Sequence, residues 1–65
     1  MNKKVMGAKL RALRGDKTQK ATADGIGVKQ STYAMYETGE RVPGDENKIR
    51  IAKYYGKTVQ EIFFD

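Results

Sequence analysis

Apolar residues recur at helical spacing near the start of the chain. Met6, Leu10 and Leu13 are separated by four and then three residues, which places them on one face of an α-helix. Gly15 follows, and a glycine often ends a helix because it tolerates a left-handed backbone. The pattern therefore predicts a first amphipathic helix that is closed by Gly15.

A second, shorter helix is predicted to begin after Thr18. Its hydroxyl can accept a hydrogen bond from a backbone N–H that would otherwise lack a partner, as an N-cap does. We expect this helix to end near Asp24 or Gly25. Two glycines around one apolar residue, Gly25-Ile26-Gly27, are typical of a tight turn.

A third helix is predicted over residues 29–38. Tyr33 and Tyr36 are three residues apart and share one face, and Gly39 stands where a helix-ending glycine is expected. Two short helices joined by a glycine-bearing turn form either a helix-turn-helix or an αα-corner with a purely structural role.

Two further helices complete the prediction. Residues 40–44 contain Pro43 and cannot continue a helix, so they form a loop. Ile51, Ala52 and Tyr55 give residues 45–55 an apolar face, and the Thr-Val-Gln-Glu sequence at 58–61 has the form of a capping box. No β-hairpin signal is present, so we expect an all-α, compact five-helix single domain that spans residues 1–65.

The chain is basic, and the charge is unevenly distributed along it. Thirteen Lys and Arg residues against eight Asp and Glu residues give a formal charge of +5. Residues 1–20 hold seven basic residues and one acidic residue, a net charge of +6. This balance favours a polyanionic partner, although Lys3, Lys4, Lys9 and Arg11 could equally form a solvated surface.

Several classes of function lack the residues that they need. The chain has neither cysteine nor histidine, and it has no glycine-rich phosphate-binding motif, so we expect no enzyme, metal site, cofactor or small-molecule ligand. No apolar run approaches the roughly 18 residues that span a bilayer, and no signal peptide is evident. We therefore expect a cytoplasmic protein with no membrane partner.

The third helix presents small and polar side chains away from its tyrosines. These outward residues are Lys29, Gln30, Ser31, Thr32, Ala34 and Met35. Glutamine can pair with adenine and methyl groups can contact thymine, so such a surface suits the major groove of DNA. The alternatives are an ordinary polar surface and, for Met35, a role as a gap-filler in the core.

At this point the sequence resembles the phage-repressor class of helix-turn-helix proteins, the XRE family, which includes Cro and the lambda repressor. The resemblance covers nearly the whole chain. Its most specific parts are Thr18-Gln19, Ala23, Gly27-Val28, Gln30-Ser31-Thr32, Tyr36-Glu37, Gly39, Arg41, Pro43 and the closing Thr58-Val59-Gln60-Glu61-Ile62-Phe63.

The resemblance implies a role for each matching residue. Gln30, Ser31 and Met35 would read base edges, with Lys29, Thr32 and Ala34 close to the groove or the DNA backbone. Thr18, Gln19 and Arg41 would contact phosphate. Glu37 would form a structural salt bridge with an arginine of the first helix, which we assign to Arg14.

The resemblance also implies how the protein acts. We expect a sequence-specific transcriptional regulator, a repressor, that binds double-stranded DNA as a homodimer in the cytoplasm of a bacterium or a phage-infected host. The rival interpretation is an interaction module of the antitoxin or anti-repressor type, which acts through a protein partner. For the dimer surface we expect an apolar patch of Val42, Tyr54, Phe63 and Phe64.

Some positions depart from the family pattern. Thr22 occupies a core place where leucine is usual, and Lys48 stands where an apolar residue is common. Gly25 near the end of the second helix costs about 1 kcal/mol relative to alanine. Lys29 replaces a Ser or Thr cap, which loses about 1 kcal/mol. The link between the first two helices is also two residues shorter than usual.

Overall fold

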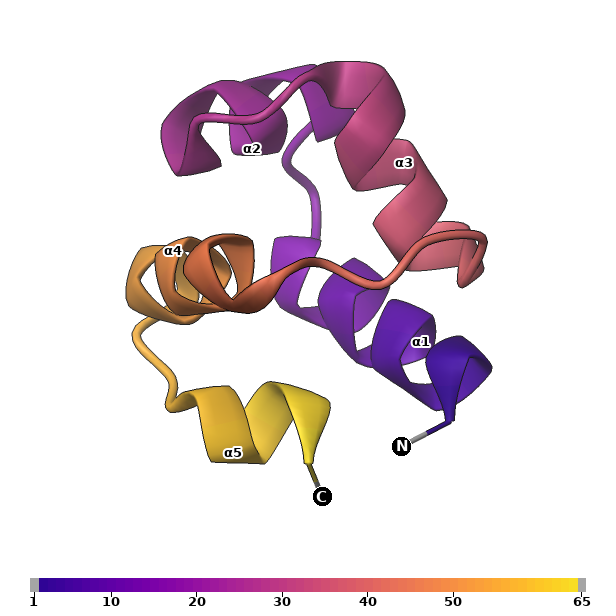
Figure 1. Ribbon diagram of the computed structural model, residues 1–65. Helices are drawn as coiled ribbons and strands as arrows, with labels where there is room; N and C mark the ends of the chain where they lie inside the picture. Colours follow the sequence, from indigo (N-terminus) through magenta and orange to yellow (C-terminus); the bar gives the residue numbers. More distant parts are fainter. Residues whose placement is uncertain (1, 65) are drawn as a thin grey trace.

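Residues 2–64, the part of the chain that this computed structural model describes, form five α-helices joined by short connections (Figure 1). The helices are α1 (Lys3–Arg14), α2 (Gln19–Ile26), α3 (Gln30–Thr38), α4 (Asp45–Tyr55) and α5 (Val59–Phe63). The all-α prediction with five helices is confirmed, and the predicted bounds of the third and fourth helices agree with α3 and α4.

Side-chain caps fix where three of the helices begin. The Thr18 hydroxyl accepts a hydrogen bond from the Ala21 N–H at 3.0 Å, as predicted. At α5 the Thr58 hydroxyl accepts from the Glu61 N–H at 3.1 Å, while the Glu61 carboxylate accepts from the Thr58 N–H at 3.0 Å, which completes the predicted capping box. Asn2 caps α1 in the same way, which the sequence analysis did not anticipate.

The predicted end of the second helix is wrong by one to two residues. Gly25 lies inside α2, and Gly27, with a φ of 97°, is the left-handed residue that ends it. The Tyr54 ring of α4 packs against Gly25, where an added Cβ would lie 2.4 Å from the Tyr54 Cε1. Gly25 therefore keeps α2 and α4 close together, which local propensity does not reveal.

One apolar core joins all five helices. It consists of Met6, Leu10, Ala23, Ile26, Tyr33, Tyr36, Ile51, Ala52, Ile62 and Phe63. Thr22 is also fully buried, and its hydroxyl has no hydrogen-bond partner among the described residues. The residue that departs from the family pattern thus fills its core position but leaves a polar atom unsatisfied there.

The helices α1 and α3 approach each other closely at Gly7. A Cβ at this position would lie 2.2 Å from the backbone oxygen of Glu37, so only glycine allows the observed packing. The crossing brings the C-terminal half of α3 onto α1 while the N-terminal half of α3 remains beside α2 (Figure 1). This contact fixes the direction in which α3 projects from the domain.

Tyrosine hydroxyls connect α3 to its neighbours inside the fold. The Tyr33 and Tyr55 hydroxyl oxygens are 2.6 Å apart, and Asn47 of α4 donates a hydrogen bond to the Tyr36 hydroxyl at 3.2 Å. Burial raises the pKa of Tyr33 well above its ordinary value, and the pKa of Tyr55 is raised for the same main reason. These side chains are therefore neutral structural groups that anchor α3.

None of the helices within residues 2–64 has both the length and the apolar character needed to cross a bilayer.

Candidate nucleic-acid interface

The helices α2 and α3 pack against each other at one end of the molecule, joined by the turn at Gly27 (Figure 1). The backbone N–H groups of Gly27 and Val28 both donate to the Ala23 carbonyl, at 2.8 and 3.0 Å. These hydrogen bonds end α2 at Gly27, and α3 begins three residues later. The result is a helix-turn-helix whose second helix has one side exposed to solvent.

The predicted outward residues of α3 do lie on its free side. Lys29, Gln30 and Ser31 are exposed, whereas Thr32, Ala34 and Met35 are partly exposed. Tyr33 and Tyr36 are buried, with 0% and 3% of their surface accessible, so they hold the opposite side of the helix in the core. A Gln side chain and a hydroxyl are therefore presented to solvent at the N-terminal end of a fixed helix.

The first turn of α3 carries no side-chain cap. Lys29 occupies the N-cap position in an extended conformation and makes no capping hydrogen bond with its side chain. The first backbone N–H groups of a helix need acceptors from outside the helix. At this end of α3 they can be supplied by water or by an anionic partner, and the positive charge of Lys29 is compatible with the latter.

The predicted ion pair between Arg14 and Glu37 is present. Arg14 Nε lies 2.7 Å from Glu37 Oε2, and Arg14 Nη2 lies 3.1 Å from Glu37 Oε1. Arg14 Nη1 also donates to the Lys17 carbonyl at 2.7 Å, which ties the short α1–α2 link to the same group. The shortened link therefore does not prevent the pairing but contributes to it.

Gln19 belongs to this network as well. Its Nε2 donates to Glu37 Oε1 at 3.1 Å, so Glu37 of α3 connects α1 and α2. Burial by itself would raise the pKa of Glu37, but the hydrogen bonds from Arg14 and Gln19 outweigh it and hold the pKa below its ordinary value. One hydrogen of the Gln19 amide is used here, and the second has no acceptor among residues 2–64.

Arg41 and Thr18 lie on either side of α3 in the sequence and are both exposed. Within residues 2–64 the Arg41 side chain forms no ion pair, and its backbone N–H donates to the Met35 carbonyl at 3.3 Å. The Thr18 hydroxyl is engaged as the cap of α2. Of the predicted phosphate contacts, Arg41 therefore has the least committed donors.

Thr38 is a further exposed position on α3 that the sequence analysis did not select. It follows Ser31 by seven residues, which places both on the same side of the helix. Its hydroxyl oxygen lies 2.9 Å from Glu40 Oε1 and 3.1 Å from the Met35 carbonyl oxygen. Extending the outward stripe by one turn beyond Met35 would have found it.

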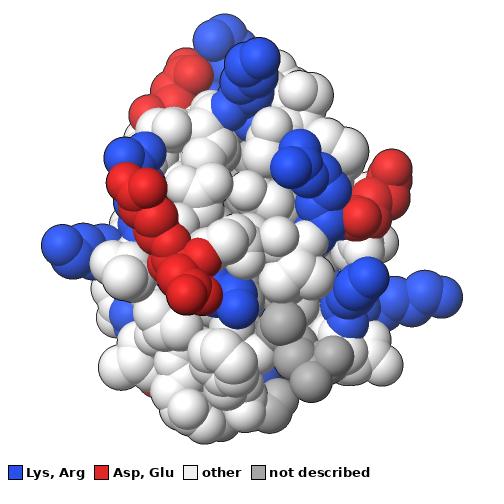
Figure 2. Space-filling view, viewed as in Figure 1, with Lys and Arg blue, Asp and Glu red and all other residues white. Residues whose placement is uncertain are grey.

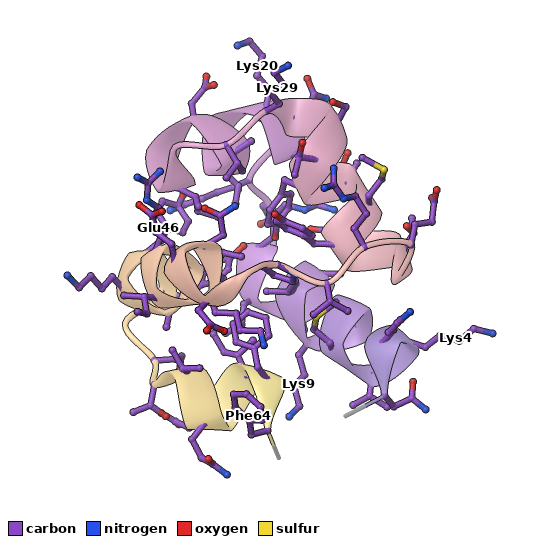
Figure 3. All side chains as sticks on the ribbon, viewed as in Figure 1. Lys4, Lys9, Lys20, Lys29, Glu46 and Phe64 are labelled. Atoms are coloured by element: carbon purple, nitrogen blue, oxygen red, sulfur yellow. The ribbon has the colours of Figure 1, made fainter. Side chains whose placement is uncertain are left out.

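The basic residues of the N-terminal third do not form one patch. Figure 2 shows Lys and Arg side chains spread over the visible face, with acidic side chains between them. Lys20 pairs with Asp24 at 3.2 Å, and Lys9 donates to the Glu61 carbonyl oxygen at 3.1 Å, far from Lys20 and Lys29 (Figure 3). The uneven charge along the sequence thus becomes a dispersed charge in space.

The predicted dimer patch needs correction. Phe63 is fully buried and belongs to the core, so it cannot form an intersubunit surface. Tyr54 and Val42 are partly buried against the core. The Tyr54 ring also packs against Gly25 and lies beneath Lys17, whose Nζ is 5.3 Å from the ring centroid. Phe64 is 55% exposed and is the most exposed member of the patch, with Lys48 Nζ 4.9 Å from its ring centroid.

A family model described as helix-turn-helix matches residues 8–62 of the chain. This range contains α2, α3 and α4 in full, together with the Arg14–Glu37 pair. The chain belongs to this helix-turn-helix family. The match agrees with the XRE-type resemblance that the sequence motifs suggested.

Two curated relatives from Vibrio cholerae are named cryptic phage CTXphi transcriptional repressor RstR. One, given without a strain, is 38% identical over 63 residues, which is 94% of this chain and 57% of the relative. The other, from an El Tor strain of serotype O1, is 38% identical over 47 residues, or 72% of this chain and 42% of the relative. The chain thus spans about half the length of the curated relatives that it matches.

Solved structures share the arrangement of the helices. The DNA-binding domain of BldD from S. venezulae superposes with a TM-score of 0.77 at 29% identity, covering 94% of both chains. ClgR from C. glutamicum, a regulator of the clp gene, superposes with a TM-score of 0.78 at 23% identity, covering 95% of this chain and 83% of the other. The ClgR likeness shows the shared fold.

Proposed function

We propose that this chain is a sequence-specific DNA-binding transcriptional repressor, formed by a single helix-turn-helix domain that binds its operator as a homodimer. The observation that carries the proposal is the free side of α3. It presents Gln30 and Ser31 to solvent, while Tyr33 and Tyr36 fix the helix from behind. The names of the similar proteins, a phage repressor and a DNA-binding domain, support the same assignment.

In this proposal α3 enters the major groove. The amide of Gln30 can donate to and accept from an adenine edge, the Ser31 hydroxyl can bond to a neighbouring base, and Met35 can contact a thymine methyl group. Lys29, Thr32 and Ala34 lie beside these residues and can contact the groove wall or the DNA backbone. Base discrimination therefore rests on the first two turns of α3.

Phosphate contacts would set the register of the helix on the duplex. The Arg41 side chain and the second amide hydrogen of Gln19 lie beyond opposite ends of α3 in the sequence, and the uncapped first turn of α3 offers backbone N–H groups. The Arg14–Glu37 pair touches no base in this proposal. It holds α2 and α3 at the angle that lets both ends contact the DNA backbone.

The proposed mode of action is occupancy. A two-fold dimer on a pseudo-palindromic operator blocks transcription when the operator overlaps a promoter. We assign the protein no catalytic role, because the candidate interface offers hydrogen-bond donors and apolar contacts but no convergent set of titratable groups. We place it in the cytoplasm, where its DNA would be accessible.

The test is selection of bound sequences from a random duplex library at physiological salt. Enrichment of one roughly palindromic site would support sequence-specific binding by a dimer and give the spacing of the half-sites. Binding that enriches nothing and disappears as salt rises would contradict the proposal and favour an interaction module that acts through a protein partner.

A matched pair of variants shows whether α3 carries the selection. Gln30→Ala removes the exposed amide on α3, whereas Gln60→Ala removes an exposed amide on α5. The proposal requires that the Gln30 variant selects a different or weaker consensus and that the Gln60 variant selects the wild-type consensus.

A further inference from the structure

A groove lies between α1 and α5, toward the opposite end of the molecule from α2 and α3. It is lined by Lys9, Ala12, Leu13, Lys57, Glu61 and Ile62, and its volume is about 360 Å³. Figure 3 shows Lys9 near α5, whereas Lys20 and Lys29 lie at the far end of the molecule. The groove uses none of the residues of the candidate DNA interface.

The floor of the groove is apolar. Leu13 packs against the core but is still partly exposed, Ile62 is buried beneath, and Ala12 is exposed on α1. A volume of this size is at the low end of the range for binding pockets. It suits a few apolar side chains from one face of a helix or a short segment.

The sides of the groove carry two lysines against one glutamate, a net charge of +1. Lys9 donates to the backbone carbonyl oxygen of Glu61, which is a neutral acceptor, and within residues 2–64 neither Lys9 nor Lys57 forms an ion pair. The Glu61 carboxylate accepts the Thr58 N–H in the capping box of α5. The hydrogen bonds to Thr58 hold the pKa of this carboxyl below its ordinary value, so it stays charged, and the two lysines exceed the acidic lining of the groove by one charge.

We propose that this α1–α5 groove binds an acidic amphipathic segment of a second protein. Apolar side chains of the segment would contact Leu13 and Ile62, and its carboxylates would pair with Lys9 and Lys57. The inference goes beyond the proposed DNA binding, because it assigns a protein partner to a separate surface. Such a partner could bind the repressor while α3 remains on DNA.

Charge argues against a second copy of this chain as the occupant. The chain has a formal charge of +5, and a two-fold contact through the groove would bring together two linings that each hold two lysines against one glutamate. Like charges across an interface oppose association, whereas an acidic segment gains from the same lysines.

The test is selection of binding peptides from a random peptide library displayed against the full chain. We expect enriched peptides to carry at least two carboxylates flanking apolar residues. We also expect them to bind the Lys9→Glu/Lys57→Glu double variant at least about tenfold more weakly than the wild-type chain. The matched control is Lys4→Glu/Lys53→Glu, which makes the same charge change at exposed positions outside the groove. It should leave peptide affinity within about twofold of wild type if contacts are local.

A third variant tests the apolar floor without removing a core residue. Ala12 is exposed on α1, so Ala12→Glu should fold, as circular dichroism would verify, while filling the groove with an acidic side chain. It should abolish binding of the selected peptides. Enriched peptides without acidic residues, equal binding by all variants, or no enriched peptide would overturn the proposal.

Sedimentation of the chain without peptide tests whether a second copy of the chain occupies the groove instead. If Ala12→Glu converts a dimer into a monomer, the groove is the contact between copies and the proposal of an acidic partner is wrong. The duplex selection on wild-type chain is independent of these results, so DNA binding and partner binding can fail separately.

Discussion

Glu37 of α3 receives hydrogen bonds from Arg14 at the end of α1 and from Gln19 at the start of α2, with Arg14 Nε only 2.7 Å from Glu37 Oε2. Only 5% of the Glu37 side chain and 18% of the Arg14 side chain are exposed. One carboxylate therefore sets the relative positions of three helices, including both helices of the helix-turn-helix.

This arrangement predicts that Glu37→Gln lowers the free energy of unfolding by about 2 kcal/mol at pH 7, because it leaves Arg14 partly buried without its counter-charge. The folded-state pKa of Glu37 lies below its ordinary value, so its contribution is present above the unfolded pKa, about 4.3. It is lost as the pH falls through the folded pKa. Urea unfolding from pH 7 to pH 2 should show the gap to wild type closing below about pH 4.

The control for this measurement is Glu46→Gln. Glu46 also pairs with an arginine, at 3.0 Å, but its side chain is 81% exposed. Exposed pairs contribute little, so this variant should stay within about 0.5 kcal/mol of wild type. Equal losses for both variants would show that the Glu37 network is not a structural strut.

Replacing threonine by valine should change the free energy of unfolding in opposite directions at Thr22 and at Thr18. Thr22→Val removes a buried hydroxyl without a partner and keeps the shape of the side chain, so it should raise the free energy of unfolding by about 1 kcal/mol. Thr18→Val removes the cap of α2 and should lower it by about 1 kcal/mol. Thermal and urea unfolding of both variants measures the difference, and a destabilised Thr22→Val would mean that the hydroxyl is satisfied in solution.

Gly7 predicts a case in which packing overrides helix propensity. Alanine is the better helix former by about 1 kcal/mol, yet Gly7→Ala should destabilise the fold by about 2 kcal/mol, because its Cβ would overlap the Glu37 carbonyl. Gly44→Ala is the comparison for steric overlap, since no atom lies within 4 Å of a Cβ built there; Gly44 is the N-cap of α4, so this variant should lose only the cap preference for glycine over alanine. A stabilised Gly7→Ala protein would contradict the close contact of α1 and α3.

Gln30 predicts a specificity change that leaves general DNA affinity intact. Gln30→Ala should weaken binding to the selected operator by about 1 to 3 kcal/mol and hardly change binding to unrelated DNA, because only base contacts are lost. Fluorescence anisotropy with specific and unrelated duplexes measures both affinities. A loss of the same size on every duplex would remove Gln30 from the base-reading residues.

Arg41 predicts the complementary behaviour. Arg41→Ala should weaken binding to specific and unrelated duplexes alike and reduce the slope of log affinity against log salt by about 0.9, the value for one phosphate contact. Lys57→Ala removes the same charge from the α1–α5 groove and serves as the control. A salt slope that is unchanged by Arg41→Ala would place this side chain away from the DNA backbone.

Local features of the sequence were sufficient to predict most of the secondary structure and the outward side of α3. The capping box at Thr58 and the glycine at position 39 act through their own neighbours, so their effect is visible in the sequence. The spacing of Tyr33 and Tyr36 likewise determines which side of α3 is buried. These predictions succeeded because caps and helical periodicity depend on residues within one or two turns.

Tertiary contacts decided the rest. Gly25 is helical because the Tyr54 ring packs on it, Phe63 rather than Phe64 is buried because of where α5 meets the core, and Gln19 bonds to a carboxylate 18 residues away. The sequence by itself determined five helices and a candidate reading surface on α3. The packing of those helices determined which side chains support that surface and dispersed the N-terminal charge, since both depend on contacts between residues distant in the chain.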